Sequence, residues 1–242
     1  MPQGGPLSPV LSNIYLDKFD KELESRGLRF VRYADDSNIF VKSEMSANRV
    51  MKSVTSWLER KLFLKVSATK TKIVRLSKSK FLGFTYFKMS DKWECAPTHK
   101  SKMKLYDKCR KELIRKKCIA RSNTITFTRI NQIVRGWINY FKIGKMKIFM
   151  DKFGQWLRHK IRVIIIKRWK KSEKIYKSLQ LLNKKLPYKF SEEQIYAVAN
   201  SRLGWYKRAN GNVINFLINA DILAINKRER PGLVNPLRYY LS

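Results

Sequence analysis

The spacing of apolar residues changes near residue 97, and this change constrains the fold more than any other feature of the chain. After Pro97 the apolar patterns have helical spacing. In the most regular one, apolar residues occur at i, i+3, i+4, i+7, i+8 and i+11: Ile130, Ile133, Val134, Trp137, Ile138 and Phe141. This spacing places all of them on one side of a helix. We therefore expect only helices after this point.

Before Pro97 the sequence combines helical and strand-like patterns. Amphipathic helices are expected over residues 8–27 and 46–62. The runs 28–33 and 37–42 are rich in β-forming residues and flank Ala34-Asp35-Asp36, which predicts an antiparallel hairpin with two carboxylates at its turn. Further strands are expected over residues 72–76, 81–87 and 93–96, the last pairing with its predecessor.

Together these patterns predict an α+β fold with two domains. Residues 1–97 would pack helices on one face of an antiparallel sheet, and residues 98–242 would form an all-α domain. The most apolar stretch, residues 163–166, is far shorter than the ~20 residues of a membrane span. The N-terminus does not resemble a signal peptide. Three cysteines without paired spacing favour a reduced, cytoplasmic chain without structural metal.

The charge of the chain is strongly positive. Lys and Arg number 53 against 18 Asp and Glu, a formal net charge of +35. Such an excess repels itself in a compact state and predicts a polyanionic partner. Ribosomal proteins, nucleic-acid enzymes and proteins that bind anionic membranes share this composition. Nucleic acid is the partner that basic folded domains usually meet.

Asp35 and Asp36 are the candidate catalytic residues. Adjacent carboxylates at a tight turn repel each other unless a cation lies beside them, and Mg²⁺ prefers such oxygen ligands. Two such ions can stabilise the attacking and leaving oxygens of a phosphoryl transfer. Because side chains alternate in direction, we expect Asp35 to be the direct ligand and Asp36 a secondary one. The alternative is a solvated Asp-Asp turn.

Several motifs, taken in order, resemble a known family. Tyr33-Ala34-Asp35-Asp36 resembles the Tyr-x-Asp-Asp motif of reverse transcriptases. Residues 2–9, 64–72 and 81–84 resemble that family's fourth, sixth and seventh conserved blocks. Residues 133–141 and 201–210 resemble the maturase-specific thumb of proteins encoded in group II introns. The resemblance covers essentially the whole chain. It implies half of a polymerase palm followed by an α-helical thumb, acting in reverse transcription and intron splicing.

The resemblance also implies roles for individual residues. Asp35 and Asp36 would hold catalytic Mg²⁺, and Lys70 would lie near the departing pyrophosphate. Gln3, Gly4 and Tyr33 would lie beside the template and the incoming nucleotide. The primer grip would comprise Phe81, Leu82, Gly83 and Phe84. From periodicity alone, residues 81–84 would be an ordinary buried strand, with Gly83 at a bulge, and Lys70 a solvated lysine.

The sequence also departs from the family pattern. A third metal-binding aspartate and the basic residues of the fingers belong to blocks before the fourth one, with which this sequence begins. Asp17, Asp20 and Asp91 are the other acidic candidates nearby, and none lies in a matching block. We therefore expect the chain alone to be inactive as a polymerase. Its expected partners are group II intron RNA, a DNA primer or target, and the missing N-terminal fingers and palm half.

The basic helix expected near residues 146–171 carries the predicted RNA contacts. Its apolar side would dock on the domain while its cations face an RNA backbone. A second group of cations flanks Trp205 and Tyr206, which are candidate stacking platforms. The predicted RNA-binding residues are Arg158, Lys160, Arg162, Lys167, Arg168, Arg202, Lys207 and Arg208. The competing interpretation of the whole chain is a non-enzymatic RNA-binding maturase module or a decaying remnant.

Overall fold

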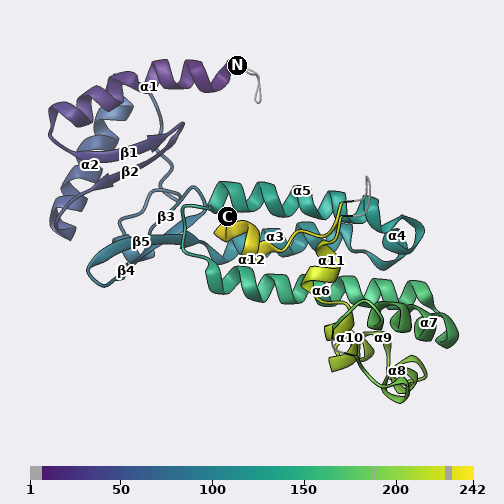
Figure 1. Cartoon of the computed structure of the whole chain (residues 1–242). Coiled ribbons are helices and arrows are strands. Elements are labelled where there is room, and N and C mark those ends of the chain that lie inside the picture. The colour runs from purple at the N-terminus through teal and green to yellow at the C-terminus, as the bar shows by residue number, and fades with distance from the viewer. Residues whose placement is uncertain (1–6, 188, 227–230) are drawn as a thin grey trace. The chain divides into compact units, whose positions relative to one another are not determined.

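The computed structural model describes residues 7–187, 189–226 and 231–242. The chain forms two compact units, residues 1–93 and 94–242. The first combines helices with small antiparallel sheets, and the second is helical beyond the end of the last strand (Figure 1). The predicted α+β class is confirmed.

Two helices and a β-hairpin build the core of the first unit. α1 (Ser8–Ser25) ends before Gly27, whose φ of 64° suits a glycine after a helix. β1 (Arg29–Tyr33), β2 (Asp36–Phe40) and α2 (Glu44–Lys61) follow. α2 is capped by the side chain of Ser43, which accepts a hydrogen bond from the backbone of Ser46. The core centres on four buried side chains: Phe19, Leu23, Val54 and Leu62.

The hairpin has one face on this core and one in solvent. Phe30 and Ile39 are directly opposite each other in the register and pack against the core. Since side chains alternate along a strand, Arg32 lies on the same inner face. Val31 and Tyr33 lie on the outer face, where they are 49% and 64% exposed.

The second part of this unit differs from the prediction. Residues 72–75 are irregular and a 3₁₀ turn, η1 (Leu76–Lys78), follows, so the strand expected over 72–76 is wrong. Ile73 and Val74 are both exposed there and do not supply a buried strand face.

A three-stranded sheet follows, in the order β3 (Lys80–Phe81), β4 (Phe84–Met89), β5 (Lys92–Pro97). The strand predicted over 81–87 is interrupted by a turn at Leu82 and Gly83. Both have positive φ, 50° and 81°, as a two-residue hairpin turn of the primed type requires. The expected pairing of residues 93–96 with this strand is confirmed by β5.

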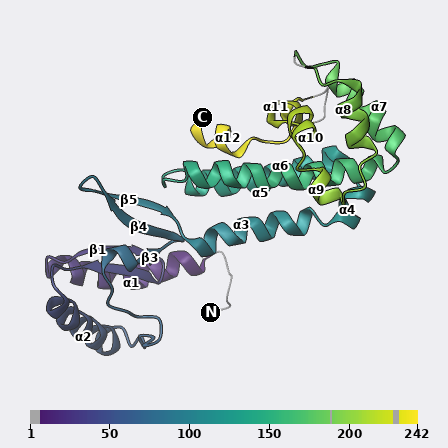
Figure 2. The same cartoon turned by 90° about the horizontal axis from the view of Figure 1, so that it is seen from below.

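Three helices form the framework of the second unit (Figure 2). They are α3 (His99–Glu112), α5 (Asn123–Phe141) and α6 (Lys147–Trp169), with α4 (Arg115–Ala120) between the first two. α5 follows the predicted apolar stripe: Ile130, Val134 and Ile138 are fully buried. Between these helices lies a cluster of aromatic rings with centroids 4.5–6.0 Å apart, comprising Tyr106, Trp137, Phe141, Phe149, Phe153 and Trp156.

Shorter helices complete the unit, and α7, α9 and α12 among them contact α6. They are α7 (Ser172–Asn183), α8 (Glu192–Ala199), α9 (Trp205–Arg208), α10 (Asn212–Leu217), α11 (Ala220–Ala224) and α12 (Pro236–Leu241). Buried Asn131 of α5 fixes the segment before α12: its amide donates to the carbonyl of Gly232 at 2.7 Å and accepts from the backbone N–H of Val234 at 2.8 Å. Within the described ranges, no helix has the length and apolar character needed to cross a bilayer.

Candidate functional site

The predicted carboxylate pair lies at the tip of the β1–β2 hairpin. Tyr33 pairs with Asp36, so the turn consists of only Ala34 and Asp35. Ala34 has a φ of 53°, in the left-handed region that residues with a Cβ disfavour. Asp36 is the first residue of β2 and lies opposite Tyr33, on the outer face of the hairpin.

Both carboxylates are exposed, and neither forms a hydrogen bond or ion pair with any described residue. Their oxygens are therefore free for a ligand. Carboxylate oxygens are the donors that Mg²⁺ prefers, and Mg²⁺ commonly takes one or two of them together with water and substrate phosphates. The pair fits such a partial donor set. A complete protein cage is absent from the described residues, which contain no group of three or more His, Cys, Asp or Glu side chains able to hold a metal ion.

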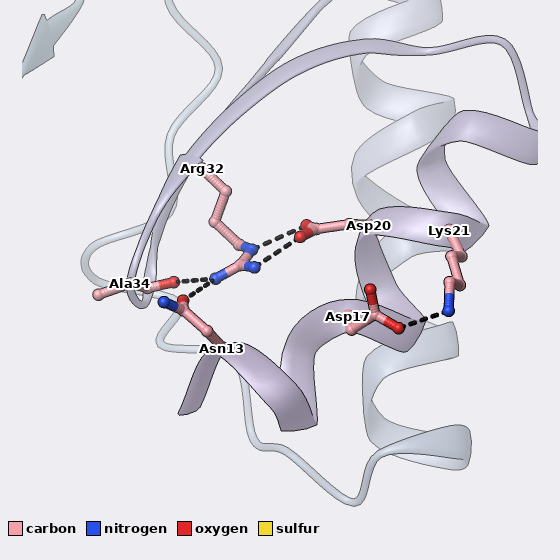
Figure 3. A network of polar contacts seen from close by, with 6 residues as sticks. All are labelled: Asn13, Asp17, Asp20, Lys21, Arg32 and Ala34. Carbon is pink, nitrogen blue, oxygen red and sulfur yellow. Dashed lines mark hydrogen bonds and ion pairs between the residues drawn. The ribbon is translucent and has the colours of Figure 1, made fainter. Parts of the chain in front are cut away.

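Arg32 of β1 connects this turn to α1 (Figure 3). Its Nε and Nη2 donate to the two carboxylate oxygens of Asp20, at 2.7 and 2.5 Å. Its Nη1 donates to the side-chain oxygen of Asn13 at 3.0 Å and to the backbone carbonyl of Ala34 at 2.9 Å. The hydrogen bond to Asp20 is the largest cause that raises the pKa of Arg32. This network was not foreseen from the sequence.

The three other acidic candidates for metal binding have cationic partners. Asp20 is held by Arg32, Asp17 pairs with Lys21 at 2.6 Å, and Asp91 pairs with Lys88 at 2.6 Å. Asp17 and Asp91 are well exposed, so their ion pairs are weak. Asp20 is engaged through both of its oxygens by Arg32.

The other residues predicted for the polymerase site lie, where the structure describes them, in other segments of the first unit. Gln3 and Gly4 lie outside the described residues. Lys70 is exposed in a turn of the irregular segment; its backbone N–H donates to the carbonyl of Ser67 at 3.2 Å, and its side-chain ammonium forms no hydrogen bond or ion pair with a described residue. Leu82 and Gly83 of the predicted primer grip form the β3–β4 turn, with Phe81 and Phe84 opposite each other at its base.

On α6, two of the predicted RNA-binding arginines make internal contacts instead. Arg162 is 8% exposed and donates to the carbonyls of Ile218 and Asn215 and to the side chain of Asn215. Burial lowers its pKa to about 10. Arg168 donates to the side chain of Asn123 and to the carbonyls of Cys118 and Arg121.

The other three predicted RNA-binding residues of α6 are half-buried and form fewer contacts inside the protein. Lys160 lies over the ring of Tyr206, 5.1 Å from its centroid. Burial lowers the pKa of Arg158. Lys167 makes no described polar contact. Of the residues named on α6, Lys160 and Lys167 are thus the better candidates for contact with a ligand.

The predicted stacking residues of α9 lie beside the same helix. Tyr206 is 57% exposed and packs edge-on against His159, with ring centroids 4.3 Å apart. Arg208 lies over Trp205 at 5.1 Å and also donates to the carbonyl of Ser201. Arg202 and Lys207 are exposed. This region therefore presents aromatic rings with cations on their faces.

A basic stripe on α3 is a further candidate that sequence reasoning missed. Its four lysines are all exposed, and none forms an ion pair with a described carboxylate: Lys100, Lys104, Lys108 and Lys111. Their spacing of four, four and three residues places them on one side of the helix. The opposite side carries the fully buried Leu105 and Cys109. The spacing of these lysines is present in the sequence and would have been sufficient to predict the stripe.

Two family models match the chain in sequence order. One, described as reverse transcriptase (RNA-dependent DNA polymerase), matches residues 1–86. The other, described as the group II intron maturase-specific domain, matches residues 102–181, from α3 into α7. No curated protein matches the chain.

Proposed function

Because the chain belongs to the reverse transcriptase/maturase family of group II introns, we propose that it joins part of an RNA-directed DNA polymerase palm to a maturase domain that binds intron RNA. The observation that carries the polymerase part is the tip of the β1–β2 hairpin. There two adjacent carboxylates are exposed and free, whereas Asp17, Asp20 and Asp91 are paired with cations. We place the functional boundary at residues 97/98, between the two family matches.

Asp35 and Asp36 would hold Mg²⁺ at this tip. When bound, the ion supplies positive charge for the attacking and leaving oxygens of a phosphoryl transfer. Asp35 lies within the two-residue turn, and Asp36 begins β2 on the face of Tyr33. This supports Asp35 as the direct ligand, with Asp36 secondary. The exposed ring of Tyr33 would lie beside the template or nucleotide, as would Gln3 and Gly4.

Two further elements have proposed roles in the reaction. The exposed ammonium of Lys70 would neutralise charge on the departing pyrophosphate. The β3–β4 turn, residues 81–84, would contact the primer strand. Both proposals rest on the position of these residues in the reverse transcriptase match.

The maturase unit would bind group II intron RNA through cations that are exposed or half-buried and have no carboxylate partner among the described residues. The α3 stripe, Lys160, Lys167, Arg202 and Lys207 are the proposed phosphate contacts, because lysines and arginines that reach phosphate supply most of the sequence-independent affinity for nucleic acid. Tyr206 is the proposed stacking ring. We do not include Arg162 and Arg168 among the proposed phosphate contacts, because their guanidinium groups already form hydrogen bonds inside the protein.

Primer extension tests the polymerase part. With a poly-adenylate template and Mg²⁺, the 242-residue chain alone should not extend a primer, because two carboxylates leave the metals under-coordinated and the triphosphate unoriented. Adding a separate polypeptide that carries family fingers and the first palm aspartate should give template-dependent synthesis. Asp35→Ala should abolish this synthesis, and Asp91→Ala, which changes an exposed ion pair, should not.

Three results would contradict the proposal. Synthesis that survives Asp35→Ala would mean that the carboxylates at the hairpin tip are not the catalytic ones. Synthesis by the chain alone would mean that two carboxylates suffice. A complemented mixture that binds RNA but never extends a primer would favour the non-enzymatic RNA-binding module.

A further inference from the structure

The guanidinium of Arg32 is bonded on every side to groups that surround the carboxylate turn. Its side chain is 10% exposed, against 24% for Asp20. One edge of the guanidinium meets both oxygens of Asp20 in a bidentate pair, the geometry that gives a charged hydrogen bond its directional strength. The remaining nitrogen reaches Asn13 and Ala34. Figure 3 shows all four contacts converging between α1 and the turn.

The contact to Ala34 has a specific consequence for the backbone. In two-residue turns, a position with positive φ is usually occupied by Gly, Asn or Asp. Ala34 has a φ of 53° although alanine disfavours this conformation. A bond from Arg32 to the Ala34 carbonyl holds the peptide between Ala34 and Asp35 in one orientation. The direction in which Asp35 leaves the backbone depends on that peptide.

We propose that Arg32 and Asp20 form a positioning pair, which fixes the Ala34–Asp35 turn to α1 and so aims the two carboxylates of Asp35 and Asp36 at their ligand. Asn13 supports the same guanidinium. This inference rests on the proposed function only where it names a divalent cation as that ligand. The orientation of the turn by Arg32 is a separate claim and is testable without metal.

α1 supplies a matched control. Asp17 lies about one helical turn before Asp20 and pairs with Lys21. Neither Asp17 nor Lys21 contacts Arg32 or the hairpin tip directly (Figure 3). Asp17→Asn and Asp20→Asn remove one negative charge each from the same helix. Any effect of total charge on a bound cation should therefore be similar in the two variants. An effect of the pair itself should occur in Asp20→Asn alone.

The experiment uses the full chain, isotope-labelled for NMR, in wild-type form and as Arg32→Lys, Asp20→Asn and Asp17→Asn. The first readout, without metal, is the set of backbone chemical shifts of residues 33–37, which report the positive φ of Ala34. The second is the broadening of the Asp35 and Asp36 amide signals by added Mn²⁺. Thermal melting of each variant provides a separate measure of stability.

We expect Arg32→Lys and Asp20→Asn to move the Ala34 and Asp35 shifts towards averaged values and to weaken Mn²⁺ affinity roughly tenfold, which corresponds to about 1.4 kcal/mol. Lysine keeps the charge of Arg32 but cannot form the bidentate pair and the turn contact together. Asp17→Asn should match the wild type in both readouts. If Arg32→Lys does not fold, the turn shifts and Mn²⁺ affinity of Asp20→Asn, which retains the arginine, test the proposal.

Unchanged turn shifts in Asp20→Asn and Arg32→Lys, even with a lower melting temperature, would overturn the proposal and leave an ordinary stabilising ion pair. Equal effects of Asp17→Asn and Asp20→Asn would also overturn it. If the wild type shows no Mn²⁺ broadening at Asp35 and Asp36, the metal site of the proposed function fails. The turn shifts then still decide whether Arg32 positions the turn.

Discussion

At the scale of single residues, a cation can have a structural or a ligand-binding role, and the sequence does not distinguish them. Arg162 and Lys167 lie on the same helix, in a run that contains both basic and apolar residues. The partners of Arg162 are 53 and 56 positions further along the chain. No local pattern predicts contacts at that separation, so the sequence placed Arg162 among the RNA-binding residues.

A structural role for Arg162 and an RNA-binding role for Lys167 predict opposite effects of alanine substitution on stability and on RNA binding. Arg162→Ala should lower the free energy of unfolding by about 1–3 kcal/mol, because it leaves the buried carbonyl of Ile218 and the partly buried carbonyl of Asn215 without the arginine donor. Lys167→Ala should change it by no more than about 0.5 kcal/mol, while weakening RNA binding. Urea unfolding and RNA titration of both variants provide the check. A stable Arg162→Ala protein that has lost RNA binding would restore the RNA-binding role predicted for this residue.

At the scale of secondary-structure elements, regular apolar spacing was sufficient for prediction. α2, α5 and α6 lie close to where their stripes indicated, because one buried face specifies a helix. Residues 72–76 and 81–87 were predicted less well. The first has β-forming residues but no strand to pair with, and the second is divided by a turn that only the positive φ of Leu82 and Gly83 reveals. The hairpin at Asp35 and Asp36 was predicted, but its anchoring by Arg32 depends on tertiary contacts.

Two glycines test the assigned elements. Gly136 lies within α5 and is exposed, and no atom lies within 4 Å of the position that a Cβ would take there. Gly136→Ala should therefore raise the free energy of unfolding by about 0.5–1 kcal/mol, through higher helix propensity. Gly83→Ala should lower it by about 1–2 kcal/mol, because φ is 81° in the β3–β4 turn.

Chemical unfolding of both glycine variants compares them directly. A destabilised Gly136→Ala protein would mean that another surface packs closely on this part of α5. A neutral Gly83→Ala protein would mean that the turn tolerates a side chain, and the assigned hairpin geometry would be contradicted.

At the scale of the whole molecule, a net charge of +35 favours a polyanionic partner, and the second unit presents cations on its surface. The α3 stripe and the surface around Tyr206 present cations without carboxylate partners among the described residues. The reverse transcriptase and maturase matches on one chain give that polyanion a chemical identity, group II intron RNA. Sequence composition predicted the class of partner, but identifying exposed cations required the fold.

The salt dependence of RNA binding tests this claim most directly. The affinity for a structured group II intron RNA would be measured across a range of salt concentrations for the wild type and for two charge-matched variants. One replaces the α3 stripe with glutamine, at Lys100, Lys104, Lys108 and Lys111. The control replaces four exposed lysines of the first unit: Lys52, Lys61, Lys65 and Lys72.

For the wild type we expect log K to fall steeply against log salt, by about 0.7–0.9 per phosphate contacted. The stripe variant should bind more weakly, with a slope shallower by about 3, as expected for the loss of four phosphate contacts. The control should keep nearly the wild-type slope. A wild-type slope near zero, or equal flattening in the two variants, would contradict the assignment of this unit as a group II intron RNA-binding domain.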